Sequence, residues 1–155
     1  MRLRPIAILL SGLTALVAPA AAQDAAQDPE RGQGLFDETC AACHQPGGVG
    51  QPGLAPPLVD DPLWSGLGDN APVYLASVVL GGLTGRITVA GTAYIGLAMP
   101  HHDWLEDDKI LDIAAYVLGE LNGVAPRLDA ETLAGLRAAP LDGPAIHALR
   151  KEALE

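Results

Sequence analysis

Two cysteines and a histidine stand together in this chain, as Cys40-Ala41-Ala42-Cys43-His44, and the sequence contains no other cysteine. Two thiols one helical turn apart can add to the two vinyl groups along one edge of a haem, and the adjoining histidine can then bind the iron. We therefore interpret the motif as a covalent haem attachment site, with Cys40 and Cys43 as the thioether residues and His44 as one iron ligand.

The same spacing also occurs in thiol redox pairs, in zinc half-sites and in simple disulfides. A redox pair favours a βαβ pattern around the motif, and the sequence has none. A zinc site needs a second Cys or His pair at matching spacing, and no cysteine remains to form one. These observations favour haem and leave the other sites as alternatives.

Met99, which Pro100 follows, is the candidate for the second axial ligand. Apart from Met1 it is the only methionine in the sequence, and it falls in an irregular stretch between two expected helices. A thioether opposite a histidine favours ferrous iron and raises the reduction potential. The alternatives are a methionine that fills a gap in the core, or ligation by His101 or His102.

The elements that must position these residues are helices joined by long irregular segments. Periodicity and capping signals predict helices over about 29–42, 73–80 and 107–121. Glycine and proline dominate 45–68, which predicts a long loop, and a second irregular stretch follows over 83–104. Such loops are uncommon in a compact domain unless they wrap something.

The end of the chain contains an internal repeat. Residues 128–137 and 141–150 share the pattern Leu-Asp-x-x-x-Leu/Ile-x-x-Leu-Arg. Each Asp can cap a short helix, and each Arg suits the last turn of that helix. We therefore predict a helical C-terminal extension over 124–155. Its narrow apolar stripes dock either on the chain's own surface or, as a hypothesis, in a groove of a partner subunit.

The beginning of the chain predicts export. Arg2 and Arg4 precede an apolar run from Ile6 to Val17, and small residues follow it. We predict a signal peptide at 1–22, a flexible lead-in at 23–28 and a periplasmic location. A retained N-terminal anchor is the alternative, and only in that case is a membrane a partner.

The charge of the chain limits its partners. Nine basic and nineteen acidic residues give a formal charge of −10, and without Arg2 and Arg4 seven basic residues against nineteen acidic ones give −12. Nucleic acid is an unsuitable partner, because phosphate contacts need clustered Lys and Arg. A redox protein with a basic docking surface is the natural complement.

Four features in this order resemble the class I cytochromes c: the motif ending at His44, then Ala55-Pro56-Pro57-Leu58, then Met99-Pro100, then the final amphipathic helix. The resemblance covers about residues 29–122. It implies an all-α class I cytochrome c fold, with three main helices around one covalently bound haem c, a cytochrome domain at 29–123 and the extension beyond it.

The resemblance also implies a function. The expected protein is a periplasmic mono-haem cytochrome that transfers single electrons between redox partners and is not itself an enzyme. One alternative is the electron-accepting haem subunit of a periplasmic dehydrogenase or terminal oxidase complex. A haem enzyme or gas sensor with a labile methionine ligand is the other.

Several residues acquire expected roles from the resemblance. Gly32 and Phe36 of the first helix match positions that cross an aromatic residue, here Tyr116, of the last helix. Pro56 matches a proline whose carbonyl accepts a hydrogen bond from the proximal histidine, a contact that orients the ring.

Three more residues are candidates for contacts with the haem propionates, with loop packing as the alternative. Arg86 is the only basic residue between Arg31 and Lys109 and is a candidate ion-pair partner. Trp64 and Tyr94 are candidate hydrogen-bond donors.

An acidic cluster follows Met99 and consists of Asp103, Glu106, Asp107 and Asp108. We interpret it mainly as an acidic first turn that suits the helix dipole, rather than as a dedicated docking patch.

Overall fold

The computed structural model describes residues 27–96, 98–125 and 127–155. The predicted signal peptide at 1–22 and the first four residues of the predicted lead-in lie outside this range. Asp28, the last residue of that lead-in, is the N-cap of the first helix, and its side chain accepts hydrogen bonds from the N–H groups of Glu30 and Arg31. Within the described residues, no helix combines the length and the apolar character needed to cross a membrane.

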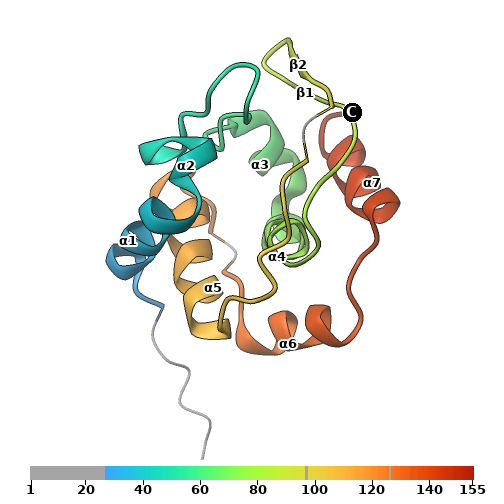
Figure 1. The fold of residues 1–155 in the computed structure, drawn as a ribbon. Coiled ribbons are helices and arrows are strands. Elements are labelled where there is room, and N and C mark those ends of the chain that lie inside the picture. Colours follow the sequence, from blue (N-terminus) through green and yellow to red (C-terminus); the bar gives the residue numbers. More distant parts are fainter. Residues whose placement is uncertain (1–26, 97, 126) are drawn as a thin grey trace, which may run out of the picture.

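The described part of the chain is mainly helical, as the all-α prediction requires (Figure 1). Its α-helices are α1 (Pro29–Thr39), α2 (Ala41–His44), α3 (Asp61–Leu67), α4 (Ala71–Gly81), α5 (Asp107–Ala114), α6 (Ala130–Ala138) and α7 (Gly143–Ala153). The smaller elements are the 3-10 turns η1 (Pro46–Gly48) and η2 (Gly68–Asn70), the π-helical η3 (Ala115–Glu120) and the antiparallel hairpin of β1 (Ile87–Val89) and β2 (Thr92–Tyr94).

α1 crosses α5 at a close approach of the two backbones. A Cβ at Gly32 would lie 2.0 Å from the carbonyl oxygen of Asp112, so only glycine fits there. One turn further on, the rings of Phe36 and Tyr116 meet with centroids 5.4 Å apart and planes inclined at 57°. The predicted crossing of Gly32, Phe36 and Tyr116 is confirmed.

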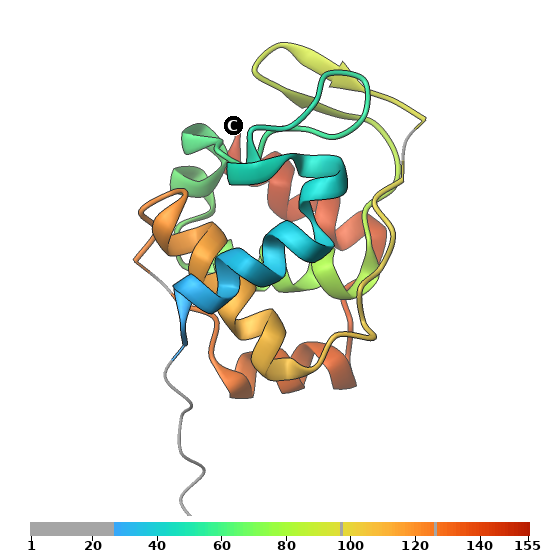
Figure 2. The same ribbon diagram turned by 60° about the vertical axis from the view of Figure 1, so that its left-hand side comes forward.

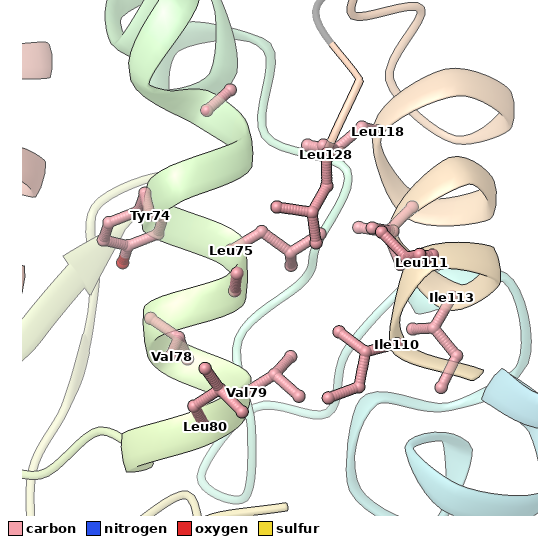
Figure 3. Packing of buried hydrophobic residues seen from close by; sticks show 14 of the residues in the cluster. Tyr74, Leu75, Val78, Val79, Leu80, Ile110, Leu111, Ile113, Leu118 and Leu128 are labelled. Atoms are coloured by element: carbon pink, nitrogen blue, oxygen red, sulfur yellow. The ribbon is translucent and has the colours of Figure 1, made fainter. Parts of the chain in front are cut away.

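α4 forms the centre of the core. It is apolar around most of its circumference, and such a helix is stable only when other elements cover all its faces. Figure 3 shows Leu75 and Val79 of α4 facing Ile110 of α5, with Leu128 of the C-terminal extension reaching between the two helices. Residues from the extension therefore belong to the same core as the cytochrome domain.

The structure corrects three predicted segments. The predicted helix at 29–42 is interrupted at Cys40, where α1 ends and α2 begins. The predicted loop at 45–68 contains the helix α3. A helix forms there because a proline is favourable in its first turn, at Pro62, and because Leu63, Trp64 and Leu67 become buried. The predicted irregular stretch at 83–104 contains the β1–β2 hairpin.

The two helices of the extension are confirmed, and so are their caps. The carboxylate of Asp129 accepts from the Thr132 N–H at 2.7 Å, and that of Asp142 accepts from the Ala145 N–H at 2.9 Å. α6 packs on α4, while α7 packs on α3 and α4 (Figures 1 and 2).

The apolar stripes of the extension are covered by the chain itself. Leu133 is 0% exposed, Leu136 8% and Ile146 1%. The hypothesis that these stripes fill a groove of a partner subunit is therefore wrong, because the cytochrome domain already buries them.

Candidate functional site

A cavity of about 270 Å³ lies between α2, α3, α4, α7, the hairpin and the segment around Met99. Most of the side chains that line it are apolar. Cys40, Cys43, His44 and Met99, which the sequence singles out for their chemistry, all belong to this lining.

The cysteine motif forms a single helical turn. α1 ends as the Cys40 N–H donates to the Phe36 carbonyl at 2.7 Å, and the N–H groups of Cys43 and His44 then both donate to the Cys40 carbonyl, at 3.1 and 2.9 Å. Gln45, with φ of 61°, ends the turn. The two sulfurs and the imidazole are therefore carried by one compact element on one side of the cavity.

His44 is buried and oriented by a backbone acceptor. Its Nδ1 lies 3.0 Å from the carbonyl oxygen of Pro56, the contact that the family resemblance implies. Burial lowers the pKa of His44; the hydrogen bond to Pro56 opposes this shift and the charge of nearby His102 adds to it. A neutral ring that donates from Nδ1 keeps its lone pair on Nε2, which is the form that binds a metal.

The segment after the motif folds back to bring Pro56 beneath His44. The Gly50 N–H donates to the His44 carbonyl at 2.8 Å, and Gln51 and Ala55 form an antiparallel bridge. Gly50 has φ of +72°, and a Cβ there would lie 2.3 Å from the nitrogen of Pro57. This glycine therefore permits the close backbone approach that sets the Pro56 carbonyl in place.

Met99 is held by Leu83, which lies just beyond the C-terminal end of α4. Its N–H donates to the Leu83 carbonyl at 2.9 Å, and its carbonyl accepts from the Leu83 N–H at 3.1 Å. Gly82 makes this possible, because it has φ of +73° and a Cβ there would lie 2.5 Å from the Met99 oxygen. A third bond, from the His102 N–H to the Val79 carbonyl at 2.7 Å, fixes the far end of the segment.

The two histidines after Met99 differ in position. His101 is exposed, and its Nδ1 lies 2.6 Å from a carboxylate oxygen of Asp103. His102 lines the cavity, and its buried Nδ1 has no hydrogen-bond partner within the described residues. Of the two histidines, His102 is therefore the one that lies in the cavity as an alternative ligand to Met99.

The three candidates for propionate contacts also differ in their positions relative to the cavity. Trp64 lines the cavity, but its indole N–H already donates to the Leu58 carbonyl at 2.7 Å. Tyr94 is buried and lines the cavity from β2.

Arg86, the third candidate, differs from Trp64 and Tyr94 in position. Arg86 is exposed and is not part of the cavity lining, because alternate residues of the adjoining strand, Ile87 and Val89, are the ones that face the cavity.

Arg150 of α7 is a cavity residue that the sequence reasoning missed. It is 7% exposed, and its guanidinium lies near the carboxylate of Asp60, the hydroxyl of Tyr74 and the carbonyl of Thr88. The repeat gave no signal for it, because Arg137 stands four residues after Leu133 just as Arg150 stands four residues after Ile146, and only Arg150 lines the cavity.

The environment of the cysteines bears on the alternatives to haem. Burial raises the pKa of the Cys40 thiol to about 11, with a further contribution from Cys43. A redox pair needs a thiolate, so this environment opposes that function. Within the described residues no three His, Cys, Asp or Glu side chains gather into a set able to hold a metal ion. The cavity, with two thiols, an oriented imidazole, a thioether and apolar walls, fits haem.

Comparisons with known proteins agree with this geometry. The family model described as Cytochrome c matches residues 29–119. Cytochrome c-552 of Thermus thermophilus is 33% identical over 119 residues, which cover 73% of this chain and 89% of the relative. Cytochrome c-552 from a particular strain of the same species is also 33% identical, over 79% of its length.

A third relative is larger. The gluconate 2-dehydrogenase cytochrome c subunit of Pantoea cypripedii is 31% identical over 113 residues, which cover 71% of this chain. The match spans only 24% of that subunit.

Proposed function

Because this chain belongs to the cytochrome c family and is thus an electron-transfer protein with covalently bound haem c, we propose which of its residues hold the haem. Cys40 and Cys43 form the thioether bonds, and His44 and Met99 are the axial ligands. The observation that carries this assignment is that all four side chains line one cavity.

Each of these residues has a separate task. Bound haem supplies a one-electron couple between ferrous and ferric iron. The Pro56 carbonyl holds the His44 ring in one orientation and makes it a better electron donor. Met99 provides a soft thioether that favours the ferrous state, and the apolar lining limits solvent access, which also tunes the potential.

The protein is in this proposal a carrier of single electrons and not itself an enzyme. With His44 and Met99 both bound to the iron, no coordination position is open to a substrate. The chain works in the periplasm, as its N-terminal sequence favours, and its formal charge of −12 after removal of residues 1–22 suits a redox partner with a basic docking surface.

Haem staining of a denaturing gel tests the attachment site. We expect the wild-type protein to keep its stain after boiling in detergent. Cys40→Ala and Cys43→Ala should each give much less stained protein, and the double variant none. Ala42→Ser, which changes the exposed residue between the cysteines, is the matched control and should stain like the wild type. A wild-type band that releases its haem on denaturation contradicts the proposal.

Mass spectrometry of the periplasmic fraction tests export. The expected species begins near residue 23 and carries one haem. Recovery of the full-length chain in a membrane fraction contradicts cleavage and supports a retained anchor instead.

A second candidate function is that of a haem subunit in a dehydrogenase complex, which the similarity to the gluconate 2-dehydrogenase cytochrome c subunit favours. Size-exclusion chromatography of the gently extracted native protein distinguishes the two. A free carrier elutes at its own mass, whereas a subunit elutes with a larger protein that reduces its haem when given that protein's substrate.

A further inference from the structure

The buried guanidinium of Arg150 is not explained by the four residues that hold the haem. It enters the cavity from the C-terminal extension, outside the region that the Cytochrome c family model matches. Among the described residues that line the cavity, Arg150 is the only lysine or arginine. A buried cation is costly unless an anion and hydrogen-bond acceptors surround it, so its partners indicate what it is for.

The protein groups around Arg150 hold it only loosely. One terminal nitrogen lies 3.6 Å from Asp60 Oδ2 and 3.2 Å from the Thr88 carbonyl, and the other lies 3.5 Å from the Tyr74 hydroxyl. Charge-assisted hydrogen bonds of this type are usually about 2.7–2.9 Å long. A guanidinium has five N–H donors in a planar fork, and these contacts leave it able to bind a further carboxylate.

α7 fixes the place of Arg150 on both sides. Before it, Ile146 is buried in the core, and the ring of His147 lies 2.7 Å from the Thr84 carbonyl. After it, Ala153 packs so closely on α3 that a Cβ at Gly66 would lie 1.8 Å from the Ala153 oxygen. The side chain is therefore delivered to the cavity by a helix that is anchored at both ends.

We propose that Arg150 pairs with a haem propionate, that Asp60 holds the guanidinium from the other side, and that the C-terminal extension thereby raises the reduction potential. The inference rests on the proposed attachment through Cys40 and Cys43, which brings two carboxylates into the cavity. A fixed positive charge beside the haem stabilises the ferrous state, whose net charge is lower by one unit. The extension is then part of the haem site as well as part of the core.

The midpoint potential of the holoprotein tests this inference. Arg150→Gln should lower the potential by an amount equal to about a tenfold change in the ferrous-to-ferric ratio, or about 59 mV for a one-electron couple. Asp60→Asn removes a negative charge from the same cluster and should shift the potential in the opposite direction, to a higher value. If the two substitutions only loosened the pocket, their shifts in potential would not be expected to have opposite signs.

Two matched controls remove a positive charge without touching the cavity. Lys151→Gln changes the next residue of α7, whose ammonium is exposed and pairs with Glu155 at 3.3 Å. Arg137→Gln changes the equivalent arginine of the repeat, which pairs with Asp107 at 2.5 Å. Both should shift the potential by less than a twofold change in the same ratio.

Two results overturn the inference. One is a shift in Arg150→Gln no larger than in the controls, and the other is a shift to lower potential in Asp60→Asn. If Arg150→Gln does not accumulate, the direction of the potential shift in Asp60→Asn still tests the inference. Arg150→Lys keeps the charge, so its midpoint potential should be closer to that of the wild type than to that of Arg150→Gln. Haem staining of every variant separates this from the proposed function, because intact covalent haem with an unchanged potential refutes only the role of Arg150.

Discussion

Met99 and His102 are two possible iron ligands that the fold brings to one cavity. The segment that carries them is hydrogen-bonded to Val79 of α4 and to Leu83 just after that helix, so neither is free to move far. Their chemistry differs, because a thioether is a soft ligand that favours ferrous iron and an imidazole binds ferric iron well. The assignment of Met99 is therefore open to a direct spectroscopic test.

We expect Met99→Ala to abolish the weak far-red charge-transfer band that sulfur ligation gives to ferric haem. The variant should also bind carbon monoxide in the ferrous state and have a lower potential, because ferrous iron loses its soft ligand. Absorption spectra with and without carbon monoxide provide the measurement.

His102→Ala and His101→Ala are the controls for that experiment. The first removes the other donor in the cavity, and the second removes an exposed ring that pairs with Asp103. Both should keep the far-red band. If His102→Ala lost the native spectrum and Met99→Ala kept it, the second iron ligand would be His102 and not Met99.

At the scale of elements, a glycine in the crossing of α1 and α5 helps to position the motif from Cys40 to His44. Gly32 lies directly against the carbonyl of Asp112, whose buried carboxylate pairs with Arg31 and accepts from the Asp28 N–H at 2.8 Å. The N-terminal end of α1 is thus tied to α5 by backbone contact and by charge. Since α2 follows α1 directly, this crossing determines where the cysteines lie.

Gly32→Ala should destabilise the holoprotein by at least about 1–3 kcal/mol, because the added methyl group overlaps backbone that cannot move independently. Gly34→Ala is the matched control on the same helix, where a Cβ meets nothing within 4 Å. It should stabilise by about 0.5–1 kcal/mol through the lower chain entropy of alanine. Denaturant unfolding measures both, and equal effects of the two substitutions would contradict the close crossing.

The cap of α6 gives a pH-dependent prediction. Hydrogen bonds from the backbone N–H and the hydroxyl of Thr132 lower the pKa of Asp129 from its ordinary value of 3.8. A carboxyl whose pKa is lowered by folding contributes stability above that ordinary value and loses it as the pH falls through the lowered value.

Asp129→Ala should therefore cost about 0.5–2 kcal/mol at neutral pH, and the difference from the wild type should vanish at low pH. Glu131→Ala, which removes an exposed acid of the same turn without removing the cap, should have a smaller effect. Unfolding curves at several pH values provide the measurement. A difference that persists below the titration range would show that the carboxylate is not what stabilises the helix.

Over the whole molecule, the acidic cluster after Met99 is tied into the fold by ion pairs. Asp107 pairs with Arg137 of α6 and Asp108 pairs with Arg31 of α1 at 3.2 Å, while Asp103 forms a hydrogen bond with the His101 ring. These contacts link three helices at the surface. They support the interpretation of the cluster as part of a helix start rather than as a dedicated docking patch.

Deleting 124–155 should lower the melting temperature markedly. The deletion removes Leu128, Leu133 and Ile146, which are at most 1% exposed, and each such side chain is worth about 1.5–3 kcal/mol before the entropy of ordering it. Thermal unfolding of the holoprotein is the measurement. Removing only Leu154, which is 46% exposed, and Glu155 is the control and should change little. An unchanged melting temperature in the long deletion would contradict a self-packed extension.

The sequence alone determined what depends on neighbours along the chain. The spacing from Cys40 to His44 matches one helical turn, and Asp129 and Asp142 cap the helices that follow them. Both are local geometries, so residue type and spacing suffice to predict them. The role of Gly32 was expected only from the resemblance to the class I cytochromes c, because its contact with Asp112 joins two distant helices.

Only the tertiary structure decided which residues from distant segments meet. Arg137 and Arg150 occupy the same position of the repeat, four residues after a buried Leu133 or Ile146. One lies at the surface beside Asp107 and the other enters the cavity beside Asp60. Local pattern cannot distinguish them, because the difference comes from the helices on which α6 and α7 pack, and burial is a property of that packing rather than of the repeat.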